Sequence, residues 1–218
     1  MTAPPPSSSA ALRRLLAEKF PSSQPRPTRV LATGLPALDA VTGGLPLGAI
    51  TEIVCSAPSC GGHLLFARLL EVTRATRGRV ALIDASDSFD PASYSKNAID
   101  HLLWVRGRSV NEALQVADLL VRDANLALIL LDLRDADQGA LRRLPATVWY
   151  RLQRAVEPSG LALVVESSRP TVPSALLRVE LQRSHGLSAL SCEQSALAAQ
   201  LEPAVQRHRL QFSELAGQ

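Results

Sequence analysis

The stretch T-E-I-V-C-S-A-P-S-C-G-G-H-L-L, residues 51–65, decides the fold. An apolar run enters it, a turn of small residues follows, and an apolar segment with helical spacing, residues 64–70, leaves it. A strand, a small-residue loop and a helix in this order are typical of a phosphate-binding loop, whose working pattern is G-x-x-x-x-G-K followed by serine or threonine. The stretch therefore predicts an α/β protein built around this unit.

The residues that give such a loop its chemistry are missing. In the register of the pattern, Ser56 stands at the first glycine, Gly61 at the second, Gly62 at the lysine, and His63 at the serine or threonine. The lysine normally reaches the outer phosphates and the hydroxyl holds Mg²⁺. A glycine-containing turn also joins strand to helix in α/β proteins that bind no phosphate, so the loop alone leaves both interpretations open. We interpret it as a phosphate-binding loop that has lost its chemistry, and we expect no cofactor and no metal.

Length and composition indicate one globular domain with a buried core. The chain has 218 residues, of which 46% are hydrophobic and only 4% aromatic, so the core is expected to consist mostly of Leu, Val, Ala and Ile. The formal net charge is +3 and the isoelectric point is about 9.0, almost all of the positive charge being arginine. Such a small excess permits contact with nucleic acid without requiring it.

Cysteine usage and hydropathy favour the cytoplasm. The longest apolar run, residues 126–131, is far shorter than the roughly 20 residues that span a bilayer, and no apolar signal segment opens the chain. We therefore expect a cytoplasmic location and no membrane contact. Cys55, Cys60 and Cys192 lack the spacing of a metal site, which predicts structural thiols rather than zinc ligands or disulfides.

Residues 1–27 differ in composition from the core, residues 28–218. Residues 1–9 are rich in Pro and Ser and are expected to be disordered. Residues 10–20 predict a short amphipathic helix, and residues 21–27 a Pro-rich linker. Since so short a helix is marginal alone, it must dock, either on its own domain or on a neighbouring chain. The apolar face offered for that contact comprises Leu12, Leu15, Leu16 and Phe20.

The rest of the chain alternates predicted strands with predicted helices. Continuous apolar runs in the strands indicate a mostly parallel sheet that is covered on both faces. Strands are expected at residues 29–31, 49–54, 79–84, 102–105, 126–132, 160–166, 176–182 and 207–215, and helices at residues 34–42, 64–76, 110–123 and 145–156, with a further helix beginning over 91–97.

With these segments in order, residues 30–215 resemble the ATPase core of the RecA recombinase family. The run A-T-G-L-P-A-L-D-A-V-T-G-G-L-P-L-G-A-I-T-E-I, residues 32–53, is similar to the segment before the family's phosphate-binding loop. Residues 82–85 and 89–91 match its next strand and turn, and residues 128–132 are similar to its Walker B strand. The resemblance implies a RecA-like three-layer α/β sandwich, plus the N-terminal helix on its Pro-rich tether.

The departures from that family concern its chemistry. Ser86 stands where the catalytic glutamate should follow Asp84-Ala85, and Ser167 replaces the glutamine that senses the γ-phosphate. The segments after residues 132 and 168 are too short for the family's two long DNA-binding loops. Each lost group should cost several kcal/mol of phosphate binding or transition-state stabilisation, so we expect no ATP hydrolysis. Asp132 remains, and it is expected to cap or pair locally rather than to hold magnesium.

Two non-catalytic groups of this superfamily keep the scaffold without the chemistry. They are ImuA, an accessory protein of a damage-induced translesion-synthesis complex, and SulA, a division inhibitor that binds FtsZ. Residues 141–157, L-R-R-L-P-A-T-V-W-Y-R-L-Q-R-A-V-E, look more like ImuA, as does the nearly complete core. This resemblance implies an adaptor that contacts an inactive ImuB-like Y-family polymerase and a DnaE2-type polymerase. The alternatives are a SulA-like inhibitor and a RecA-like ATPase or recombinase. In RecA-type proteins the helix before the core packs on the next protomer, which also implies self-association.

An arginine cluster suggests a second kind of partner. The candidates for contact with single-stranded or primed DNA are Arg142, Arg143, Arg151, Arg154 and Arg169. Arg178 and Arg183 follow in the next strand, and Trp149 and Tyr150 lie beside the cluster. Guanidinium groups pair with phosphates in bidentate fashion, which favours a DNA-backbone patch. An ordinary charged helix face, with Glu157, Asp135 and Asp137 as partners, explains the same residues equally well.

Overall fold

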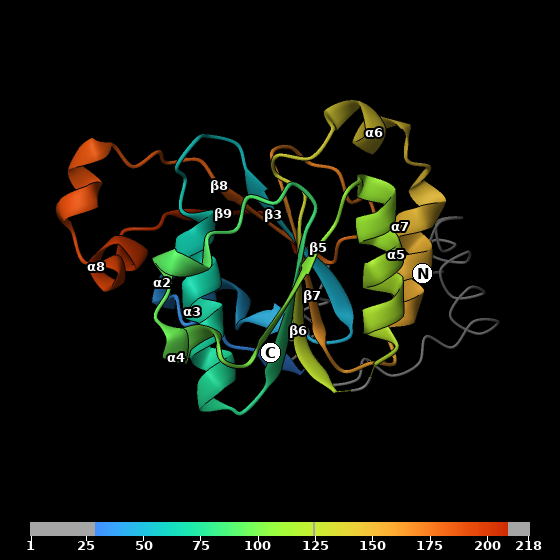
Figure 1. Cartoon of the computed structure of the whole chain (residues 1–218), viewed down its shortest axis with the longest axis horizontal. Coiled ribbons are helices and arrows are strands. Elements are labelled where there is room, and N and C mark those ends of the chain that lie inside the picture. The colour runs from blue at the N-terminus through green and yellow to red at the C-terminus, as the bar shows by residue number, and fades with distance from the viewer. Residues whose placement is uncertain (1–28, 124, 209–218) are drawn as a thin grey trace, which may run out of the picture. The chain divides into compact units, whose positions relative to one another are not determined.

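A seven-stranded sheet forms the centre of the computed structural model, which describes residues 29–123 and 125–208. The strand order is β5-β4-β6-β7-β3-β8-β9, with parallel pairing throughout except between β8 and β9, which are antiparallel. Helices cover both faces, so the predicted three-layer α/β architecture is confirmed (Figure 1). The helix predicted at residues 10–20, with Leu12, Leu15, Leu16 and Phe20, lies outside the described residues.

The helices and strands follow the chain in alternation. Their bounds are β1 (Val30–Leu31), α2 (Pro36–Thr42), β2 (Leu45–Pro46), β3 (Ala49–Cys55), α3 (Gly62–Ala75), β4 (Arg79–Asp84), α4 (Lys96–Ile99), β5 (Leu102–Arg106), α5 (Val110–Val121), β6 (Leu126–Asp132), α6 (Gln138–Arg143), α7 (Ala146–Val156), β7 (Ala162–Ser167), β8 (Leu177–Leu181), α8 (Gln194–Ala199) and β9 (Pro203–His208). Short 3₁₀ turns, η1 (Pro91–Ser93) and η2 (Leu187–Ser191), precede α4 and α8.

Two apolar clusters hold the layers together. On one face of the sheet, α2 and α3 pack against β3, β4 and β8; on the other, α5 and α7 pack against β4, β6 and β7. Figure 1 shows these two groups of helices on opposite sides of the strands. The central strands β3, β6 and β7 are apolar along nearly their whole length because both faces are covered. In α7 the buried residues Trp149, Leu152 and Val156 recur at helical spacing and face this core.

The structure differs from the sequence-based expectation at four places. Helix α6 lies in a segment that we expected to be a short loop, and Asp137 caps its start by accepting a hydrogen bond from the Gly139 N–H. The helix expected over residues 91–97 is divided into η1 and α4. The segment between β8 and β9 contains η2 and α8, which were not predicted. The last described strand, β9, begins at Pro203 instead of residue 207, and pairs with β8.

Candidate functional site

The loop between β3 and α3 has the strand, turn and helix that the sequence predicts. β3 ends at Cys55, the loop occupies residues 56–61, and α3 begins at Gly62. Gly61 precedes the helix with φ of 98°, in the left-handed region that favours glycine. A Cβ atom built on Gly61 would also overlap Cδ2 of Leu201, so that side chain would have to move if another residue stood here.

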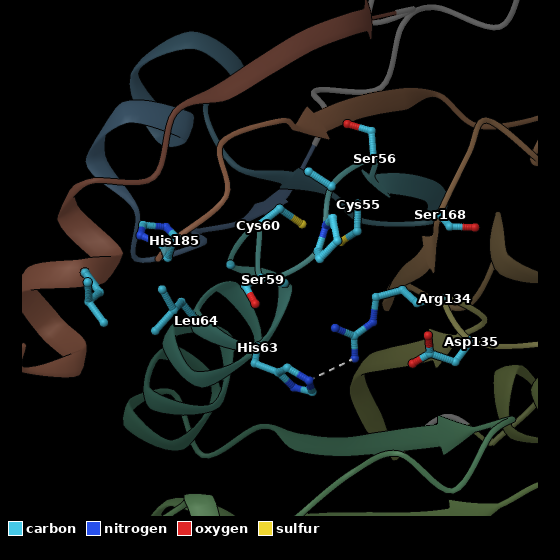
Figure 2. A pocket seen from close by; sticks show the side chains of 15 residues that line it. Cys55, Ser56, Ser59, Cys60, His63, Leu64, Arg134, Asp135, Ser168 and His185 are labelled. Carbon is cyan, nitrogen blue, oxygen red and sulfur yellow. Dashed lines mark hydrogen bonds between the residues drawn. The ribbon is translucent and has the colours of Figure 1, made fainter. Parts of the chain in front are cut away.

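A cavity of about 690 Å³ opens over this loop. Its lining comprises residues 55–64 together with Arg134, Asp135, Ser168, His185 and Leu197. In Figure 2 the loop and Arg134 approach the cavity from opposite sides. The cavity therefore occupies the place where a phosphate-binding loop would hold its ligand.

Three acidic residues end neighbouring parallel strands beside the loop. Asp84 of β4 is in register with Asp132 of β6, and Asp132 is in register with Glu166 of β7. All three side chains are buried. Asp84 is satisfied locally, because its carboxylate accepts hydrogen bonds from the N–H groups of Ser86, Ser88 and Phe89 and so fixes the turn after β4. Asp84 thus has a structural role that needs no ligand.

Arg134 neutralises the other two acids. Its Nη2 lies 2.5 Å from Oδ2 of Asp132, and its Nε lies 3.0 Å from Oδ1 of Asp132 and 3.1 Å from Oε2 of Glu166. Burial lowers the pKa of Arg134, but the two carboxylates outweigh it and the pKa is raised above its usual value. The expectation that Asp132 pairs locally is confirmed, with Arg134 as the partner.

The guanidinium of Arg134 lies beside the point where a lysine side chain at position 62 would begin. A Cβ atom built on Gly62, the position of the missing lysine, would lie 3.2 Å from Nη1 of Arg134. It would also lie 3.1 Å from Sγ of Cys55 and 3.3 Å from Oε1 of Glu166. Such distances are tighter than ordinary carbon contacts, so this space is already filled from within the protein.

The charges around the loop differ from those of a working phosphate site. Burial raises the pKa of Glu166 to about 7, with Arg134 opposing that rise and Asp132 adding to it. His63, at the position of the magnesium-binding hydroxyl, has Nε2 3.4 Å from Nη2 of Arg134 (Figure 2). Burial, followed by the charge of Arg134, lowers the pKa of His63 and favours its neutral form. Two carboxylates thus share one cation at the place where phosphate oxygens would need positive charge.

The arginine candidates lie on three segments that follow β6 and β7 in the chain. Arg142 and Arg143 are in the last turn of α6, Arg151 and Arg154 are in α7, and Arg169 follows β7. All five are exposed. Only Arg143 makes an ion pair among the described residues, a 3.9 Å contact between Nη2 and Oδ2 of Asp137. The other four guanidinium groups are available to a partner.

The aromatic neighbours of the cluster have different environments. Trp149 is only 2% exposed and belongs to the core, whereas Tyr150 is 50% exposed. Tyr150, Arg151 and Arg154 recur at positions i, i+1 and i+4, which places the two arginines on one face of α7 with Tyr150 beside them. Arg142 and Arg169 line a separate small cavity of about 220 Å³, which is closed below by Trp149. The structure therefore brings Arg142 and Arg169 together across two different chain segments.

Two further arginines, Arg178 and Arg183, make ion pairs within the protein. Nε of Arg178 lies 2.6 Å from Oε2 of Glu52, a residue with 0% exposure in the middle of β3. The other oxygen of Glu52 accepts hydrogen bonds from Ser167 and from the N–H groups of Thr171 and Val172. Arg183 pairs with Glu202. Arg178, which sequence reasoning placed near the DNA candidates, is thus committed to a buried ion pair, whereas Arg183 pairs on the surface.

Sequence reasoning also missed Arg134 and Glu166. A signal was present: an acid ends each of three buried strands, and an arginine follows the second acid after one residue. The carboxyl ends of parallel strands meet at one edge of a sheet, so a compensating cation was to be expected there.

Among the described residues, no helix is long and apolar enough to cross a bilayer.

Comparison with known proteins agrees with this architecture. Residues 19–137, more than half of the chain, match the model of the RecA N-terminal domain. The RecA protein of Streptomyces venezuelae is 35% identical over 111 residues, which cover 49% of this chain and 29% of that protein. The RecA protein of Nocardioides sp. is 38% identical over 113 residues, which cover 49% of this chain and 31% of that protein. The match thus spans about a third of the length of these relatives, and on the family model the chain belongs to the RecA N-terminal domain family.

Proposed function

We propose that the chain is a non-catalytic RecA-like adaptor of a damage-induced translesion DNA synthesis complex. The observation that carries the proposal is the position of Arg134, which lies beside the position of the nucleotide-binding lysine and is held there by Asp132 and Glu166. An ion cluster of this kind keeps the loop rigid without a ligand. The scaffold then serves as a docking frame, and its partners are an ImuB-like inactive Y-family polymerase and a DnaE2-type polymerase.

Co-purification tests the partners. We expect the tagged full chain to retain an ImuB-like protein and not FtsZ. Deleting residues 1–27 should weaken partner binding or self-association by about tenfold or more, because burying one large apolar side chain contributes roughly 1.5–3 kcal/mol. The measurements are binding affinity and mass in solution. If the tagged chain retains FtsZ but not the ImuB-like protein, the proposal is wrong and the division-inhibitor alternative is favoured.

The DNA contact rests on the exposed arginines of α6 and α7. We expect the triple substitution Arg142→Ala, Arg151→Ala and Arg154→Ala to weaken single-stranded DNA binding. If each guanidinium contacts one phosphate, the slope of log K against log salt should become less negative by about 2, since each phosphate contact contributes about 0.7. A matched control removes three exposed arginines elsewhere, Arg29, Arg77 and Arg79, for which the described residues provide no ion pair. Equal effects of the two triple variants, or wild-type binding without salt dependence, would remove the DNA patch.

A further inference from the structure

The cavity over the loop contains two cysteines that neither the ion cluster nor the adaptor role uses. Cys55 ends β3 and Cys60 lies near the far end of the loop. Both are free and buried, with 8% and 4% exposure, and both line the cavity. Figure 2 shows the Cys60 side chain pointing from the loop toward Cys55. The remaining cysteine, Cys192, is exposed at the end of η2.

The two thiols have unequal chemistry. Their side chains hydrogen-bond to each other, and this bond, assisted by burial, raises the pKa of Cys55. The same hydrogen bond lowers the pKa of Cys60 to about 6, against the effect of burial and with help from the Gly62 N–H at the start of α3. We assign Cys60 as the attacking sulfur because it lies just before the start of α3, where the N–H of Gly62 stabilises a thiolate.

We propose that Cys55 and Cys60 form a redox-sensitive dithiol, which a hydroperoxide converts into an intrachain disulfide inside the loop cavity. The Cys60 sulfur attacks a peroxide oxygen, the O–O bond breaks, and the other oxygen leaves as water or alcohol after taking up a proton. The Cys55 sulfur then attacks the sulfenic acid on Cys60, the S–O bond breaks, and a second water leaves with the Cys55 proton. Two thiols lose two electrons, and the peroxide gains them.

The geometry of the loop supports this modification. Both thiols line one cavity, and the Cys60 side chain points toward Cys55 (Figure 2). The loop also carries the connection between β8 and β9: the His185 N–H donates to the Ser59 carbonyl at 3.0 Å, and Oγ of Ser184 donates to the Pro58 carbonyl at 2.7 Å. We therefore expect the disulfide to shift the loop carbonyls that bind His185 and Ser184, and so to change the position of residues 182–202. This inference is independent of the adaptor role.

Peptide mapping of the oxidised full chain tests the proposal. The reduced protein is treated with hydrogen peroxide near neutral pH, alkylated with a maleimide and digested with trypsin. Residues 30–68 contain no internal lysine or arginine, so one tryptic peptide holds both cysteines. We expect most of this peptide to be unalkylated and lighter by two hydrogen atoms, and to be restored by a thiol reductant, while Cys192 is alkylated.

Matched variants separate the pair from the exposed thiol. The bond should form unchanged in Cys192→Ser and be lost in Cys55→Ser, where Cys60 should instead react with a sulfenic-acid probe. The proposal is overturned if the peptide from the wild type carries two maleimides, if Cys60 goes to a sulfinic acid while Cys55 is alkylated, or if only Cys192 is oxidised. The wild-type map decides even where Cys55→Ser fails to fold.

Discussion

Replacing Arg134 by alanine is expected to lower the free energy of unfolding by about 3–5 kcal/mol, because Asp132 and Glu166 would stay buried without their shared cation. Denaturant unfolding, followed by circular dichroism, measures the effect. The control is Arg143→Ala, which breaks an ion pair whose two side chains are both largely exposed and should change stability by less than about 0.5 kcal/mol. Equal effects of the two substitutions would show that Arg134 does not stabilise the buried carboxylates of Asp132 and Glu166.

A second substitution shows whether Arg134 fills the place of the lysine. Gly62→Lys alone should destabilise the protein by about 1–3 kcal/mol, since its Cβ would lie 3.2 Å from Nη1 of Arg134 in an already filled space. In the Arg134→Ala background the contact with the guanidinium is relieved, while those with Cys55 and Glu166 remain, and the new ammonium can pair with Asp132 and Glu166. The double variant should therefore be more stable than the sum of the single effects predicts, with a coupling energy of about 1 kcal/mol or more. Additive effects would contradict the account.

Strand β6 could be predicted because it is apolar without interruption up to its last residue. Residues 126–132 form β6 as expected. A strand that is buried on both faces is apolar at nearly every position, and such a continuous apolar run is easy to recognise in a sequence. Helix α6 escaped prediction because it is only one and a half turns long and buries a single large residue, Leu141. So short a segment shows no periodicity in the sequence, and its start depends on the side chain of Asp137.

The departures of the loop from the phosphate-binding pattern could be read from the sequence, but the residues that surround it could not. Gly62 and His63 show from the sequence alone that a lysine and a hydroxyl are missing. The replacement depends on register: β6 and β7 pair so that Asp132 lies beside Glu166, and this pair draws Arg134 toward Gly62 from a different part of the chain. Strand order and register determine which distant segments come into contact, and the spacing of residues along the sequence does not show these contacts.

Weak nucleotide binding is the largest effect that we expect from the proposed function. A triphosphate at this loop would meet the side chains of Asp132 and Glu166 with their cation already engaged, and it would find no lysine at Gly62 and no hydroxyl at His63. Each missing contact removes several kcal/mol, so the dissociation constant for ATP should be weaker than about 1 mM. Mg²⁺ should not improve it, because Asp132 is paired with Arg134.

Calorimetric titration of the full chain with ATP, with and without Mg²⁺, is the most direct test, with phosphate release measured on the same sample and an active RecA protein as positive control. The account predicts no saturable heat and no release of phosphate. Saturable binding that requires Mg²⁺, or steady turnover of ATP, would contradict it.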